Sequence, residues 1–518
     1  MMLDTTVGVF VWLLGLCVGS FLNVVVYRLP RGLSIRRPSR SFCPQCRATI
    51  AWYDNIPVLS WLLLRARCRH CGQPISMQYP LVEATTGLTF VLVYHLLFSA
   101  GARAGLPPLE HVRDWPLLLS WLILVASLVA CAAMDVTSYM VDVRLTCVPI
   151  GAGIILHAMW PHGFSAPPLL GLPVTAAAAA AFILSLVMLW LTVWRVPDTE
   201  PGFAPPPAEE PKHSTKEPRA ALGVLAVVVL IGLTGWLLAE TALHGRGDQP
   251  PHWGRPTDRA ERYAMANARA ARADAASRLA APAALALIFA TLVLAAALPR
   301  ATDREVHAAI EDEQPQARRL ALRELLWLAP VLIAAAAVYV GVSEIPALKA
   351  AWAAATGWSW AGLCPAGGAA WAMLGAMAGA GAGWTLRILF TLVFGREAMG
   401  VGDIYILAAA GATAGWDIAL AGLPLGVGLA IVGYAISLLL KRTVVIPFGP
   451  WLAIGFVAAL WLSSPITRLA RRDYENAVLT WSERPDICLV AAGLLLVGSG
   501  LAIVLARLTR RAVEGRRP

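Results

Sequence analysis

The sequence predicts an all-α polytopic membrane protein with about 13 transmembrane helices. Its 518 residues are 58% hydrophobic and 14% charged, and the mean hydropathy is +0.64. Soluble domains are far less apolar and carry about 25% charged residues. Apolar runs of about 18 or more residues, long enough to cross a hydrocarbon core roughly 30 Å thick, recur along the chain. We therefore expect the chain to fold in a bilayer.

The first expected crossing covers residues 6–27. We interpret it as a retained helix and not a signal peptide, because no basic segment precedes it and the polar stretch GSFLN lies inside it. The short run at 404–415 does not span a bilayer alone. The crossings after the first are 84–101, 116–134, 143–159, 174–194, 220–243, 277–298, 324–343, 368–394, 404–415, 418–440, 447–463 and 488–507.

Arginines set the expected orientation. Nine of them lie between Arg28 and Arg69, and the C-terminal RLTRRAVEGRRP is also basic. Cytoplasmic loops carry an excess of Lys and Arg, so we expect both regions in the cytoplasm and the N-terminus outside. The loop 244–276 conflicts with this alternation because it carries six arginines. Either it is an amphipathic surface helix or one crossing nearby is miscounted.

Four of the nine cysteines form two CxxC pairs, which are separated by 21 residues. Two hairpins with two thiolates each can close a tetrahedron around Zn²⁺, which leaves no coordination position open for chemistry. Disulfides or redox motifs are the alternative, although the cytoplasm is a reducing compartment in which the thiols of a loop stay reduced. We expect a structural zinc site made of Cys43, Cys46, Cys68 and Cys71. We expect small buried side chains at Cys17, Cys131, Cys147, Cys364 and Cys488.

Two aspartates at the ends of apolar runs are candidate catalytic residues. Asp135 follows one such run, and Asp403 ends the glycine-rich stretch MGVGD. Carboxylates at membrane helices are costly and indicate function. When two lie close together, one holds a proton while the other stays charged, so the pair can activate water and protonate a leaving amine. We expect Gly400 and Gly402 to let the backbone turn tightly and approach its partner or a substrate strand, because glycine tolerates conformations closed to other residues.

Structural roles are the alternative for these acids. Either Asp135 or Asp403 alone is also consistent with a helix cap or an interfacial anchor. Asp142, seven residues after Asp135, is either the true partner in the pair or the cap of a helix that starts near Val143.

Seven stretches carry a resemblance to a known family: GSFLNVVVYRLP (19–30), CPQC, WYDNIPVLSWLLLRARCRHCGQPIS (52–76), YPLVE (79–83), MDVTSYMVDVRLT, EAMGVGD (397–403) and IPFGPWLAIG (446–455). In this order they resemble the bacterial type IV prepilin peptidases, or leader peptidase/N-methyltransferases, which are GxGD-type aspartic proteases. The resemblance implies removal of the short basic leader from type IV prepilins or type II secretion pseudopilins. The cleavage site would face the cytoplasm at the inner membrane.

The resemblance also implies residue roles. Asp135 and Asp403 match the catalytic aspartates, and the four CxxC cysteines match zinc ligands. Many members then methylate the new N-terminus with S-adenosylmethionine. The residues that would bind this cofactor are not identified, because no glycine-rich nucleotide loop follows a strand.

Two features depart from the family pattern. Met140 and Val141 precede Asp142 where Leu-Pro is common, and about 200 residues separate the two aspartate motifs. Four crossings fit inside this insertion, and an even number returns the chain to the same side. An eight-helix core therefore remains, with four inserted helices and one at the C-terminus.

The expected domains follow this division. They are a first transmembrane helix (1–27), a cytoplasmic zinc-binding loop (28–83), two parts of a peptidase core (84–159 and 368–463), an inserted membrane segment of unknown role (160–367), and a C-terminal helix with a basic tail (464–518).

Two other functions compete with peptidase activity. A transporter or channel would use Asp135 and Asp403 as proton or cation sites, but the conspicuous carboxylates cluster at helix ends. An inactive peptidase-like scaffold is the third option. We expect prepilin or pseudopilin substrates and the lipid bilayer as partners, and no nucleic acid, because the net charge of +10 lies mostly in loops between apolar helices. The oligomeric state stays open.

Overall fold

The structure is a computed structural model of the chain. Within the residues that it describes, the chain is helical apart from irregular connections and two isolated antiparallel bridges. The all-α class predicted from hydropathy is therefore confirmed. The described residues are 2–36, 40–99, 109–138, 141–160, 171–195, 284–286, 288, 316–359, 363–395, 397, 399–439 and 447–463.

Seven of the described helices are long and apolar enough to cross a membrane. They are α1 (Met2–Arg28), α3 (Gln78–Tyr94) with the π-helical turn η2 (His95–Ser99), α4 (His111–Ser138), α6 (Gly171–Arg195), α10 (Ala317–Glu344), α12 (Pro365–Phe394) and α14 (Trp416–Leu439). Three further apolar helices are shorter: α5 (Val143–Ala158), α13 (Val401–Ala414) and α15 (Gly449–Trp461). The chain is a multi-pass membrane protein, because helices this long and apolar are stable in the hydrocarbon core of a bilayer and would expose too much apolar surface to water.

Ten of the thirteen expected crossings coincide with these helices. The crossings 220–243 and 488–507, the loop 244–276 and the basic tail lie outside the described residues. Of the crossing 277–298 the structure describes only residues 284–286 and 288, which are helical. Helix α11 (Pro346–Gly357) was not expected, since it is too short to give a membrane-spanning signal.

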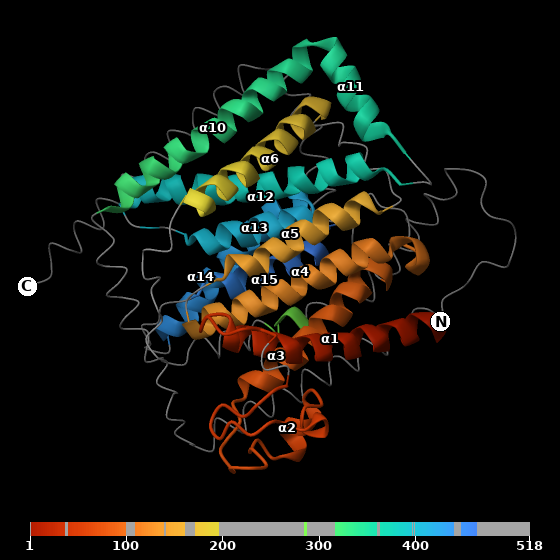
Figure 1. Ribbon diagram of the computed structural model, residues 1–518, viewed down its shortest axis with the longest axis vertical. Helices are drawn as coiled ribbons and strands as arrows, with labels where there is room; N and C mark the ends of the chain where they lie inside the picture. The colour runs from red at the N-terminus through yellow and green to blue at the C-terminus, as the bar shows by residue number, and fades with distance from the viewer. Residues whose placement is uncertain are drawn as a thin grey trace, which may run out of the picture.

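The helices run side by side across the view in Figure 1. The cysteine loop lies at one edge, next to α1 and α3, and α10 and α11 lie at the opposite edge. Helix α13 lies inside the bundle, where it packs against α4, α5, α12, α14 and α15. Among the described helices, α10 packs on α6, α12 and α11, and 11% of its apolar span is buried by described residues, against 83% for α3.

Helices α12 and α13 touch backbone to backbone. A Cβ atom built at Gly375 would lie 1.9 Å from the carbonyl oxygen of Gly411, and the reverse distance is also 1.9 Å. No larger residue fits at either position without separating the helices. Such small-residue contacts permit close helix packing in lipid. This contact fixes α13 against α12.

The expectation of buried cysteines holds for only part of the set. Cys131 is buried and Cys364 is half-buried, but Cys17 and Cys147 are exposed. The prediction is wrong for these two because an apolar position on a membrane helix can face lipid as well as the protein core. Cys488 lies outside the described residues.

Candidate active site and metal centre

Each CxxC pair lies in a tight hairpin. The ends of the two hairpins, 42–49 and 67–74, are joined by antiparallel bridges. In both, the first cysteine donates its backbone N–H across the turn, over 2.9 Å in one and 2.8 Å in the other. The residue after the second cysteine has a positive φ, 55° at Arg47 and 68° at Gly72. The two hairpins that the cysteine spacing predicted are therefore present, and they share one turn geometry.

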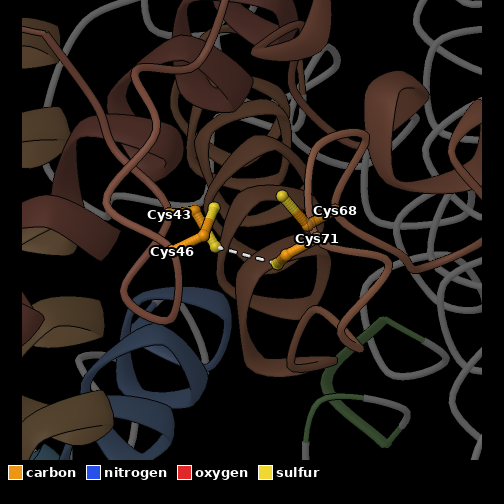
Figure 2. A group of neighbouring side chains, drawn as sticks. All are labelled: Cys43, Cys46, Cys68 and Cys71. Carbon is orange, nitrogen blue, oxygen red and sulfur yellow. Dashed lines mark hydrogen bonds between the residues drawn. The ribbon is translucent and has the colours of Figure 1, made fainter.

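The four thiols of Cys43, Cys46, Cys68 and Cys71 point toward one another (Figure 2), and their sulfur atoms all lie within 4.8 Å of one another. The Sγ atoms of Cys43 and Cys71 are 4.0 Å apart. A tetrahedral zinc ion with Zn–S bonds of about 2.3 Å needs sulfurs about 3.8 Å apart. The group therefore fits a metal ion with little adjustment, and none of its cysteines is in a disulfide.

The thiols of this group differ in acidity. Burial raises the pKa of Cys43 to about 12. Burial also acts against ionisation of Cys68, but backbone N–H groups of Cys71 and His70 lower its pKa to about 7. The hairpin backbone thus already favours a thiolate at one position, and thiolates are the form that binds a metal.

Polar contacts order this loop and attach it to α3. The guanidinium of Arg69 donates to both carboxylate oxygens of Asp54, over 2.7 and 2.6 Å, and these hydrogen bonds hold the pKa of Asp54 below its ordinary value. Glu83 of α3 is buried and accepts a 2.6 Å hydrogen bond from the N–H of Val58. The hydrogen bond from Val58 therefore holds the loop against α3.

Asp135 lies in the last turn of α4 and is 8% exposed. Its Oδ2 accepts a 2.9 Å hydrogen bond from the backbone N–H of Gly449, the first residue of α15. A Cβ atom at position 449 would lie 3.0 Å from this oxygen, so the glycine permits the close approach. Donors at a helix N-terminus stabilise a negative carboxylate.

Asp403 lies in the first turn of α13 and is also 8% exposed. It interacts electrostatically with Asp135 and with Arg387. Ile406, one turn further along α13, lies 3.6 Å from the Cβ position of Gly449, whose N–H binds Asp135. The ends of α4, α13 and α15 therefore meet, and the two aspartates that the sequence singled out lie near enough to interact electrostatically.

The special conformation expected of the two motif glycines is wrong. Gly400 has φ −67° and ψ 148°, which any residue can adopt, and Gly402 has no positive φ. The requirement at Gly402 is one of space. A Cβ atom there would lie 2.7 Å from the Cβ of Val141, in the segment that follows Asp135. Gly402 therefore allows the two aspartate segments to pack together.

Asp142 caps α5. Its Oδ1 accepts a 2.8 Å hydrogen bond from the N–H of Arg144, and its Oδ2 forms a 2.6 Å ion pair with the Arg144 guanidinium. Partial burial acts to raise the pKa of Asp142, but the hydrogen bonds and charge of Arg144 hold it below its ordinary value. This carboxylate is thus engaged at the start of α5, as the capping alternative described.

Sequence reasoning missed Arg387, which lies on the apolar helix α12 and is 7% exposed. Its guanidinium contacts Glu324, Glu397 and the carbonyl oxygen of Met399. A signal for it was available, because a lone arginine within an apolar stretch is expensive and indicates a specific partner. The N–H of Gly449 carried no such signal.

Comparison with known proteins finds similarity over part of the chain. Residues 13–97 match the family model of the bacterial peptidase A24 N-terminal domain. Over 192 residues the chain is 44% identical to a prepilin leader peptidase/N-methyltransferase of Myxococcus xanthus (strain DK1622). Over this stretch the chain is similar to the prepilin leader peptidases. A second relative with that name, from Klebsiella pneumoniae, is 42% identical over 156 residues.

The similarity to these prepilin leader peptidases is partial. It covers 36% of this chain and 50% of the Myxococcus protein, and 29% of this chain and 61% of the Klebsiella protein. The chain therefore spans about half of the first relative's length and about three fifths of the second's. No solved structure matches the chain.

Proposed function

We propose that the chain is a membrane aspartic endopeptidase that removes the short basic leader of type IV prepilins or type II secretion pseudopilins. The observation that carries the proposal is that Asp135 and Asp403 lie on helix ends that meet, each 8% exposed and near enough to interact electrostatically. A transporter would need polar groups along a path through the membrane, and this pair lies at helix ends.

The chemistry follows from the sharing of one proton. The charged carboxylate accepts a proton from water as the water oxygen attacks the scissile carbonyl carbon. The protonated carboxyl gives its proton to the leaving amine as the C–N bond breaks. In this scheme the N–H of Gly449 holds Asp135 in one orientation, so that the carboxylate does not turn away from the water.

The placement of the site at the membrane surface suits the proposed substrate. The basic leader stays in the cytoplasm while the apolar segment behind it lies among the helices. Arginines near this end support a cytoplasmic site in the inner membrane, because cytoplasmic ends carry the excess of basic residues. They include Arg28 at the end of α1 and Arg318, Arg319 and Arg323 in the first turns of α10.

The cysteine group would hold Zn²⁺, which matches four thiolates in tetrahedral geometry. With all four positions taken by protein, the ion would stabilise the loop and take no part in bond cleavage. The names of the relatives include N-methyltransferase, and we extend the proposal to methylation of the new N-terminus with S-adenosylmethionine.

The test is cleavage of a co-expressed prepilin-like protein by membranes that carry the wild-type chain, Asp135→Asn, Asp403→Asn or Asp142→Asn. Asparagine keeps the side-chain volume and removes the charge. Asp142→Asn is the matched control, since it lies in the same region and caps α5. We expect processing to disappear in the first two variants and to persist in the third.

Each other outcome points elsewhere. If Asp403→Asn cleaves at the wild-type rate and Asp142→Asn does not, Asp142 is the second catalytic carboxylate. A wild-type chain that is inserted in the membrane and never cleaves would favour an inactive scaffold.

A further inference from the structure

The inserted segment reaches the candidate active site through α10. This helix begins at Ala317 and belongs to the residues between the two aspartate motifs. Arg318 in its first turn contacts Leu392 and Glu324 in its second turn contacts Arg387, so the start of α10 runs antiparallel to the end of α12. Helix α12 leads directly to the stretch that carries Asp403.

The buried guanidinium of Arg387 is the centre of this contact. On one side, its Nε and Nη2 donate to the carboxylate of Glu324 on α10, and the Nη2–Oε1 distance is 2.8 Å. On the other side, its Nη1 contacts Glu397 and the carbonyl oxygen of Met399. Met399 directly precedes Gly400, so three residues separate this contact from Asp403.

The paired hydrogen bonds between Arg387 and Glu324 fix the orientation of the Arg387 guanidinium. A bidentate pair between guanidinium and carboxylate holds both planes together, which a single contact does not do. Without Glu324, the Nε and Nη2 donors would be buried without this partner, and the guanidinium would turn to place them on Glu397. The hydrogen bond to the Met399 carbonyl would then be lost or displaced.

A second contact from α10 acts on the same connection. The Nε of Arg318 donates to the carbonyl oxygen of Leu392 in the last turn of α12, over 3.1 Å. Its Nη2 lies 3.2 Å from the Cβ position of Gly395, which ends α12 with a φ of 69°. Arg318 thus covers the turn at which the chain leaves α12 toward Glu397.

We propose that α10 of the inserted segment is a positioning element for the active site, in which Glu324 acts through Arg387 to fix residues 397–399 and so the place of Asp403. This inference rests on the proposed peptidase function. It assigns a role to the insertion, because the helix that carries Glu324 is part of it.

The test measures kcat and KM for leader cleavage by the full-length chain. Glu324→Gln keeps the size of the side chain and weakens the bidentate pair. We expect kcat to fall roughly tenfold to a hundredfold, since a displacement of about 1 Å costs up to about 100-fold. KM should change little, because a change that acts only on the position of Asp403 lowers kcat without removing an interaction that binds the substrate. Glu344→Gln, exposed at the other end of α10, is the matched control and should behave as wild type.

A double variant separates positioning from a general loss of stability. If Glu324 acts through the guanidinium, Glu324→Gln should cost much less in an Arg387→Lys background, where no bidentate pair exists. Equal losses in both backgrounds would overturn the inference. So would a Glu324→Gln variant with wild-type kcat.

If Glu324→Gln does not accumulate in the membrane, substitutions of two exposed residues in the first turn of α10 test the inference instead. Arg318→Ala should lower kcat and Arg319→Ala should not, since Arg318 is the one that binds the Leu392 carbonyl. Equal rates would overturn the inference. A wild-type chain without cleavage would instead overturn the proposed peptidase function, so the two failures are distinguishable.

Discussion

The two glycines before Asp403 should respond differently to substitution. A Cβ atom at Gly402 would lie 2.7 Å from the Cβ of Val141, whereas one at Gly400 would lie 3.5 Å from Oδ2 of Asp403, an ordinary contact. We therefore expect Gly402→Ala to impair leader cleavage severely and Gly400→Ala to leave it close to wild type.

The magnitude follows from the overlap. Non-bonded carbons prefer separations of about 3.5–4.0 Å, so the contact at Gly402 requires a movement of about 1 Å. Overpacking of this kind costs about 1–3 kcal/mol, while alanine gains at most about 1 kcal/mol of helix propensity over glycine. The clash therefore outweighs the gain. Since Asp403 is the next residue, we expect the rate to fall by up to about 100-fold.

A second-site variant makes this reasoning sharp. Val141→Gly removes the Cβ atom that is struck, so it should restore activity to Gly402→Ala. Val141→Ala keeps that atom and should not. The assay is the cleavage rate in membranes with matched amounts of each variant. Equal activity of Gly402→Ala and Gly400→Ala, or equal rescue by both Val141 variants, would refute the argument.

Two further predictions concern the loop and the start of α5. Replacing Cys43 by serine should abolish tight metal binding, measured by elemental analysis of the purified chain, while Cys17→Ser on α1 should retain it. Full metal content in Cys43→Ser would contradict the proposed site. Acid should also release the metal from the wild-type chain, because the cysteines bind it only as deprotonated thiolates. Asp142→Ala removes the cap of α5 and should cost about 1 kcal/mol of stability at neutral pH. Because the pKa of Asp142 lies below its ordinary value, this contribution is complete above the unfolded pKa of about 3.9 and is lost as the pH falls through the lower folded pKa. The difference in Tm between wild type and Asp142→Ala should therefore vanish in strong acid, and a difference that persists there would refute the linkage.

The sequence by itself determined the helices and the metal loop. An apolar run of sufficient length has no stable alternative to a helix in lipid, because every backbone donor and acceptor must be satisfied within the segment. The spacing of two CxxC pairs likewise leaves few arrangements other than two hairpins that face each other. The two aspartates were identified as candidates because carboxylates are costly at the ends of apolar helices.

Only the tertiary structure decided how these parts meet. Hydropathy gives the depth of a residue in the bilayer but not which helix lies beside it. The contact of Gly402 with Val141, the N–H of Gly449 at Asp135, and the pairing of Arg387 with Glu324 each join segments that are far apart in the chain. Such contacts depend on the shapes of the helix surfaces that pack together, and this complementarity cannot be read from either segment alone.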